Sequence, residues 1–134
     1  RDYLGKMDFT LLTSISEGQP LTILESYAAH KPVITTDVGN CRELIYGNED
    51  GFGDAGILTH IMNIEEIAHA MVTMSVNEKD RRRMGEAGYR RVNALYRIDQ
   101  MKEVYREIYK GFSDRQNLSW TEEPFQISVY EKMM

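Results

Sequence analysis

Two glutamates, Glu17 and Glu25, are the side chains in this sequence whose spacing and setting could do chemistry. The stretch that holds them leaves an apolar run, crosses a short turn at Gly18 and Pro20, and then enters a helical pattern. One carboxylate therefore lies in a strand-to-helix loop and the other on the helix, which is where an open α/β sheet binds ligands. There the two carboxylates could accept hydrogen bonds from the hydroxyls of a sugar and a ribose. Spacing alone favours the plainer interpretation, a loop glutamate and a surface glutamate on a helix.

The backbone around Gly18 and Gln19 is a second candidate for ligand binding. A short turn at a helix N-terminus points N–H groups at solvent and carries partial positive charge, so a diphosphate would fit there. Pro20 removes one N–H donor from this turn. Gly39, which follows the next apolar run and precedes another helix start, is a similar candidate. Both glycines could equally be ordinary turn glycines, and the spacing leaves these alternatives open.

Short apolar runs and helical periodicity predict the elements that must position these residues. Three nearly continuous apolar or β-branched runs predict strands at residues 9–13, 33–36 and 56–59. Helices are predicted after each strand, and the last of them extend to about residue 112. Asn40 followed by Glu43 predicts a capping box at a short helix. Gly111 predicts the C-terminal cap of the last helix.

This order of elements predicts an α/β fold, the second half of a doubly wound Rossmann-like parallel sheet, with three strands followed by C-terminal helices. Three strands are few for such a sheet, so we expect an edge that is exposed or covered by a partner. We expect the domain to span residues 1–112. Residues 113–134 would form a tail that packs on the domain or on a partner, because they include Trp120, Pro124 and Phe125.

Composition and charge exclude several classes of protein. The length of 134 residues fits one domain. A net charge of −5 argues against a nucleic-acid partner, which would require a basic face. The single cysteine, Cys41, excludes a disulfide framework and a cysteine-based zinc site. No apolar stretch approaches the length that spans a bilayer. Because the chain begins with Arg1, we expect it to be a piece of a longer protein.

The two glutamates are the start of a longer pattern. Four further segments follow the E-x7-E motif in order: Lys31–Gly39, Arg42–Ile45, the strand run Gly56–Leu58, and a closing helix with Met101, Tyr105 and Tyr109. Over residues 2–112 the sequence resembles the C-terminal, donor-binding half of the family 4 retaining glycosyltransferases, which have the two-domain GT-B fold. The amino-acid sequences of Thr13–Leu21 and Asp37–Leu44 are most similar to those of the Pel exopolysaccharide-type subgroup.

The resemblance implies roles for individual residues. Glu17 would be a catalytic residue that binds hydroxyls of the donor hexose, and Glu25 would bind the ribose of the nucleotide. The remaining donor-binding residues would be Gly18, Gln19, Pro20, Leu21 and Gly39. Many members have a second glycine where this chain has Pro20 and an aromatic where it has Gln19. These departures bear on the backbone contact at Pro20 and on the choice of sugar at Gln19.

The resemblance also implies the reaction and its partners. We expect transfer of a hexose from a nucleotide-sugar, a UDP-sugar by this resemblance, to a polysaccharide or glycan acceptor, with no metal and no other cofactor. The basic residues that clamp the diphosphate, and the N-terminal acceptor domain, would lie upstream of Arg1, so this piece by itself should be inactive. The expected location is the cytoplasm, at the inner face of the membrane in a polysaccharide synthesis complex, with a dimer through an exposed sheet edge as one arrangement.

Two alternatives remain from the sequence. One is a non-catalytic Rossmann-like module that binds a nucleotide or another protein. The other is a UDP-sugar epimerase of the same architecture, which would convert UDP-GlcNAc to its 2-epimer. The E-x7-E context and the tyrosines of the closing helix favour the transferase.

Overall fold

A computed structural model of the chain describes residues 3–115. The chain divides into two compact units, residues 1–98 and residues 99–134. The first contains a short 3-10 helix, η1 (Leu4–Lys6). It also contains the three strands and the α-helices α1 to α4 of the described residues. The second contains helix α5 (Ile98–Arg115) beyond its first residue. The tail residues Trp120, Pro124 and Phe125 lie outside the described residues, so the predicted packing of the tail and the domain boundary at residue 112 stay predictions.

The sheet has three parallel strands in the order β1 (Thr10–Leu12), β2 (Val33–Thr36) and β3 (Gly56–Thr59). Leu12 pairs with Thr35, and Thr36 pairs with Thr59, so the carboxyl ends of all three strands meet at one edge. Every residue of β2 is buried. A continuous apolar or β-branched run is typical of a strand covered on both faces. The α/β class and the three parallel strands predicted from the sequence are therefore confirmed.

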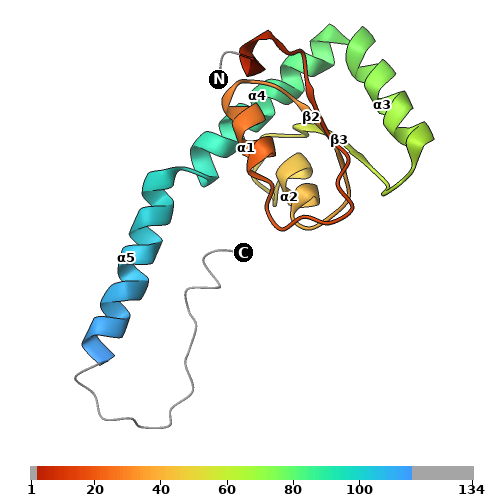
Figure 1. Cartoon of the computed structure of the whole chain (residues 1–134). Helices are drawn as coiled ribbons and strands as arrows, with labels where there is room; N and C mark the ends of the chain where they lie inside the picture. The colour runs from red at the N-terminus through yellow and green to blue at the C-terminus, as the bar shows by residue number, and fades with distance from the viewer. Residues whose placement is uncertain (1–2, 116–134) are drawn as a thin grey trace. The chain divides into compact units, whose positions relative to one another are not determined.

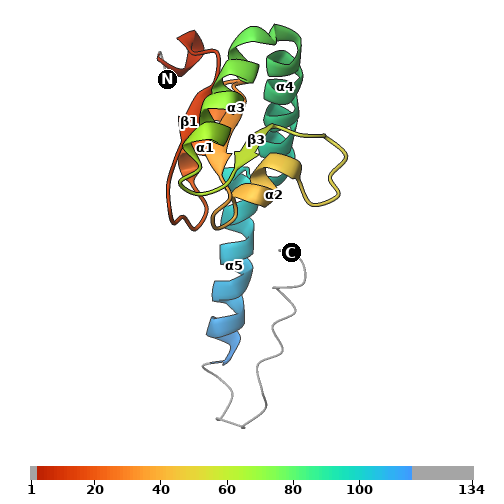
Figure 2. The same cartoon turned by 90° about the vertical axis from the view of Figure 1, so that its right-hand side faces the viewer.

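Helices cover the two faces of the sheet unequally. One face packs against α1 (Leu21–Ala28), α2 (Cys41–Tyr46) and α4 (Glu78–Leu95), and the core there includes Val33 of β2. The opposite face packs against α3 (Ile64–Val76), where Ile34 of β2 contacts buried side chains of that helix. Successive strand residues point to opposite faces, which is why Val33 and Ile34 belong to different clusters. Figure 1 shows α1 beside α4, and Figure 2 shows α3 and α4 side by side.

Within the described sheet, β1 and β3 each pair with β2 along one edge, and their outer edges have no partner strand. Leu11, in the middle of β1, is 42% exposed, whereas its partner Ile34 on β2 is fully buried. A single exposed apolar side chain is common on protein surfaces and does not by itself indicate a partner. The open edge expected from the sequence is present, and its occupant stays a prediction.

The end of α1 has a left-handed residue where glycine is usual. His30 has φ +57, and the N–H of Lys31 donates to the oxygen of Ser26 at 2.9 Å, which is the Schellman arrangement. The His30 ring stacks on Tyr89 of α4, with the ring centroids 3.7 Å apart. This stacking and the close approach of the two helices hold α1, and with it the loop that precedes α1.

Two predicted caps are wrong. Asn40 has ψ 12, outside the extended region of a usual N-cap, and its side chain makes no capping bond to α2. Its backbone N–H donates to the main-chain oxygen of Gly18 in the neighbouring loop, and not to the side chain of Glu43 as a capping box requires. Gly111 does not end α5, which continues to Arg115. A single glycine inside a helix costs only about 1 kcal/mol, so it does not by itself end the helix.

Side-chain caps occur at two other helix starts. Asn63 Oδ1 accepts from the N–H of Glu66 at 3.1 Å, and Asn77 Oδ1 accepts from the N–H of Asp80 at 3.1 Å. Within residues 3–115, no helix combines the length and the apolar character needed to cross a bilayer.

Candidate functional site

The loop after β1 touches the loop after β2 at the carboxyl edge of the sheet. The N–H of Asn40 donates to the main-chain oxygen of Gly18 at 2.9 Å. Gly39 has φ +51, and a Cβ atom built on it would lie 2.1 Å from the main-chain oxygen of Glu17. Any side chain at position 39 would push the two loops apart. The structure therefore brings together Glu17, Gly18 and Gly39, three of the residues that the sequence predicts for the donor site.

The carboxylate of Glu17 is oriented by its own loop. The hydroxyl of Ser14 donates to Glu17 Oε1 at 2.7 Å, and Glu17 itself is half-buried. The main-chain oxygen of Ser14 accepts from Thr36 Oγ1 at 2.5 Å. Thr36 is the buried last residue of β2, so the loop after β1 is tied to the neighbouring strand as well as to its own.

The turn between Glu17 and α1 leaves backbone open to solvent. Gly18 and Gln19 are exposed, and a Cβ atom on Gly18 would meet no atom within 4 Å. Pro20 is buried and occupies the N-cap position with φ −72, so α1 begins one residue later, at Leu21. Backbone N–H groups at a helix N-terminus favour an anionic partner. The open turn and the carboxylate of Glu17 thus adjoin each other along the chain.

Glu25 lies on the exposed side of α1, and Leu21 is also exposed there. The helix is fixed by its buried side: Ser26, the next residue, has its hydroxyl 2.9 Å from Thr10 Oγ1 on β1. Ile23 packs into the core on the same side. The structure therefore places Glu25 on the helix that follows the Glu17 loop, as the sequence predicts, with its carboxylate directed to solvent.

A buried ion pair that the sequence analysis missed holds the loop after α2. Arg91 of α4 is 0% exposed and donates to Asp50 from Nε at 2.5 Å and from Nη2 at 3.1 Å. Its other bonds go to the main-chain oxygens of Leu44, Ile45 and Gly53. The hydrogen bond from Arg91 lowers the pKa of Asp50. In the sequence, Arg91 follows Arg90 in a charged helix and gives no sign that it is buried.

Tyr27 adds to the same network from α1. Its hydroxyl donates to the main-chain oxygen of Leu44 at 3.0 Å, an oxygen that Arg91 also contacts. Burial raises the pKa of Tyr27 well above its usual range, so the hydroxyl stays a donor. The end of α2 is thus fixed from two helices.

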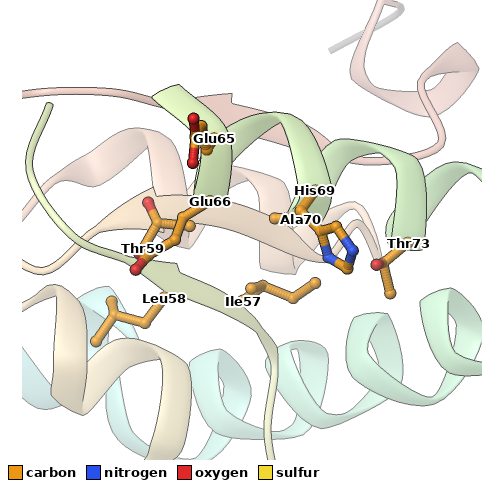
Figure 3. A pocket seen from close by; sticks show the side chains of 8 residues that line it. All are labelled: Ile57, Leu58, Thr59, Glu65, Glu66, His69, Ala70 and Thr73. Carbon is orange, nitrogen blue, oxygen red and sulfur yellow. The ribbon is translucent and has the colours of Figure 1, made fainter. Parts of the chain in front are cut away.

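The described residues have at least two hollows at their surface. One, of about 420 Å³, lies where β3 faces α3, and Figure 3 shows its lining residues Ile57, Leu58, Thr59, Glu65, Glu66, His69, Ala70 and Thr73. It contains none of the predicted donor residues. The other, of about 360 Å³, includes Gly39 and is otherwise lined by Asn40, Arg42, Glu43, Gly47 and Asn48. Arg42 at its rim pairs with Asp37.

Metal ligands do not gather at either hollow. Among residues 3–115, no three His, Cys, Asp or Glu side chains are grouped as the ligands of a metal ion would be. The roles of the seven predicted site residues stay predictions, since the geometry fixes where they lie and not what they bind.

Known structures share the fold. The chain matches sucrose-phosphate synthase from Thermosynechococcus elongatus with a TM-score of 0.69 and 24% sequence identity, over 81% of this chain and 27% of that one. The likeness confirms the fold predicted from the sequence: three parallel strands with flanking helices, of the GT-B type.

Curated proteins share the sequence. An uncharacterized glycosyltransferase of Methanocaldococcus jannaschii is 28% identical over 112 residues, which is 84% of this chain and 30% of the relative. The N-acetyl-alpha-D-glucosaminyl L-malate synthase of Bacillus anthracis is 30% identical over 108 residues, which is 81% of this chain and 27% of that protein. The chain therefore spans less than a third of the length of these relatives. Residues 1–91 match the family described as "Glycosyl transferases group 1". The chain belongs to this glycosyltransferase family.

Proposed function

We propose that this chain is part of a family 4 retaining glycosyltransferase that transfers a hexose from a UDP-sugar to a polysaccharide or glycan acceptor. The observation that carries the proposal is the contact between the loops after β1 and β2. This contact holds the Glu17 carboxylate beside the open backbone of Gly18 and Gln19 at the start of α1. A carboxylate next to free N–H groups matches the two demands of a nucleotide-sugar, which presents hydroxyls beside a diphosphate.

Each residue has a separate role in this proposal. Glu17 accepts hydroxyls of the hexose, and Glu25 accepts those of the ribose. The backbone from Gly18 to Leu21 lies against the hexose and the diphosphate. Gly39 supports that backbone through its close contact with Glu17 and Gly18. Transfer with retention would proceed by front-face displacement through an oxocarbenium-like state. Its largest demand is stabilisation of the leaving diphosphate.

The rest of the active site belongs to other parts of a longer protein on this proposal. One helix start supplies a partial positive charge, which is small beside the charge of a diphosphate. Further cations and the acceptor-binding domain would come from residues that this chain does not contain. No metal or other cofactor takes part. We assign the protein to a Pel-type subgroup that works at the cytoplasmic face of a membrane. This assignment rests on the amino-acid sequences of Thr13–Leu21 and Asp37–Leu44.

The test is binding of nucleotide-sugars to the full-length protein by calorimetry. Glu25→Ala should weaken binding of the UDP-hexose about tenfold or more, because charge-assisted hydrogen bonds contribute about 1.5–3 kcal/mol. Glu107→Ala, which removes an exposed helical glutamate from α5, is the matched control and should leave binding unchanged. Equal affinity of wild type and Glu25→Ala would refute the role of Glu25.

The same preparations separate the proposal from its alternatives. Binding of UDP with no gain from the attached hexose would favour a nucleotide-binding module. Conversion of UDP-GlcNAc to its 2-epimer would favour an epimerase. Transfer of the hexose with retained anomeric configuration would support the proposal directly.

A further inference from the structure

Ser14 joins the candidate residue Glu17 to the end of strand β2. Its hydroxyl donates to Glu17 Oε1 at 2.7 Å, and its main-chain oxygen accepts from Thr36 Oγ1 at 2.5 Å. Thr36 is 1% exposed, whereas Glu17 is half-buried. Two hydrogen bonds therefore run through one residue, from the interior of the sheet to a carboxylate that solvent can reach.

The position of this link follows from where the strand ladder stops. Leu12 of β1 is the last residue paired with β2, opposite Thr35. The backbone register between β1 and β2 ends at this pair. The hydroxyl of Thr36 supplies the next bond between strand and loop, in place of a backbone pair. A β-branched side chain has few rotamers, so a buried threonine holds the oxygen of Ser14 firmly.

The bond from Ser14 restricts the carboxylate before any ligand arrives. Ordering a glutamate side chain costs up to about 2 kcal/mol of conformational entropy, which a preformed bond removes from the cost of binding. The bond occupies part of the acceptor capacity of Oε1, and an ionised carboxylate has about four acceptor sites in all. Glu17 can therefore keep its bond to Ser14 and still accept hydroxyl groups.

We propose that Ser14 is a positioning residue: its hydroxyl, held through Thr36, orders the Glu17 carboxylate for the hydroxyls of the donor hexose. This inference rests on the proposed function, since it needs a hexose at Glu17. A carboxylate held in one orientation distinguishes sugars whose hydroxyls point differently. Ser14 therefore acts on the hexose part of the affinity and leaves the nucleoside diphosphate part unchanged.

The experiment compares two ligands on the full-length protein by calorimetry. The first is the hexose nucleotide that binds best among UDP-, GDP- and ADP-hexoses, and the second is the matching nucleoside diphosphate. Ser14→Ala should weaken binding of the first about fivefold and leave binding of the second unchanged, because Glu17 must then be ordered at the expense of hexose binding. Ser14→Thr keeps the hydroxyl and should restore the affinity. The matched control is Ser75→Ala, which removes a hydroxyl that donates to Met71 on the exposed side of α3.

A double variant tests whether Ser14 acts through Glu17. Ser14→Ala combined with Glu17→Ala should bind the hexose nucleotide no more weakly than Glu17→Ala alone, because Glu17→Ala removes the acceptor through which Ser14 acts. If Ser14→Ala does not fold, Ser14→Cys gives the same comparison, since its thiol is of similar size and a weaker donor.

The outcomes separate this inference from the proposed function. If Glu17→Ala weakens binding of the hexose nucleotide and Ser14→Ala binds it like wild type, the inference is overturned and the proposed function stands. Equal weakening of both ligands by Ser14→Ala would mean general disturbance of the loop and would also overturn it. If wild type binds no nucleotide-sugar, the proposed function fails and the inference fails with it.

Discussion

A Cβ atom on Gly39 would lie 2.1 Å from the main-chain oxygen of Glu17, so the loops after β1 and β2 touch through their backbones. Gly39 also has φ +51, which costs an L-residue about 1–2 kcal/mol. Gly39→Ala should therefore destabilise the protein by at least about 2 kcal/mol, since the clash with a backbone atom adds to the cost of φ. Urea unfolding followed by circular dichroism measures this. A Gly39→Ala protein as stable as wild type would contradict the contact.

Gly18 should respond in the opposite way. It is exposed, its φ is outside the left-handed region, and an added Cβ would meet nothing within 4 Å. Gly18→Ala should leave the free energy of unfolding within about 0.5 kcal/mol of wild type. On the proposed function it should weaken nucleotide-sugar binding about tenfold, because the methyl group would stand where the donor lies against the backbone.

The control for Gly18 is a glycine with equally open surroundings outside the candidate site. A Cβ atom on Gly5, in η1, would also meet nothing within 4 Å. Gly5→Ala should change neither stability nor nucleotide-sugar affinity. If Gly18→Ala bound the nucleotide-sugar as tightly as wild type, the backbone at Gly18 would not lie against the donor.

The strands could be predicted from the sequence because their signal is local. The strand Val33–Thr36 begins and ends at the predicted residues, because a β-branched run that is buried on both faces has few alternative structures. The placement of Glu17 and Glu25 on a loop and the following helix also came from local pattern. Gly111 shows the limit of this approach: a single glycine predicted a helix end, but the helix continues to Arg115.

The contacts that hold the candidate site could not be predicted, because they join residues that are distant in sequence. The hydroxyl of Thr36 contacts the loop at Ser14, and Arg91 of α4 contacts Asp50 in the loop after α2. The sequence around Thr36 and Arg91 does not indicate these contacts. Thr36 resembles any threonine of a strand, and Arg91 lies in a run of charged helix residues. Their roles depend on the sheet register and on the approach of Arg91 to the end of α2, which no short window of sequence contains.

The pair of Arg91 and Asp50 predicts a stability that depends on pH. Asp50 is 7% exposed by its side chain, and Arg91 is 0% exposed. Asp50→Asn should cost about 2–4 kcal/mol near neutral pH, because it leaves a buried guanidinium without its counter-charge. The bond from Arg91 lowers the pKa of Asp50 in the folded state. This stabilising contribution is therefore complete above the unfolded pKa, about 3.9, and is lost as the pH falls through the folded value.

Urea unfolding at about pH 7 and about pH 3 checks both statements, because the gap between wild type and Asp50→Asn should shrink at the lower pH. Asp54→Asn is the matched control, since Asp54 is an exposed carboxylate of the same loop. It should change stability by less than about 0.5 kcal/mol at either pH. A gap between wild type and Asp50→Asn that stays constant or grows on acidification would contradict the lowered pKa.

Gly88 allows α4 to approach α1, and here two known effects on stability have opposite signs. Alanine is the better helix former by about 1 kcal/mol, so propensity alone predicts that Gly88→Ala stabilises the protein. A Cβ atom on Gly88, however, would lie 2.3 Å from Cδ1 of the Tyr27 ring, which is fully buried and cannot move aside freely. Overpacking of a core costs about 1–3 kcal/mol, so Gly88→Ala should be net destabilising in urea unfolding. Gly111→Ala makes the same change in α5 at a position with open surroundings and should be neutral or stabilising. Stabilisation by both substitutions would mean that α1 and α4 do not pack as closely as the structure places them.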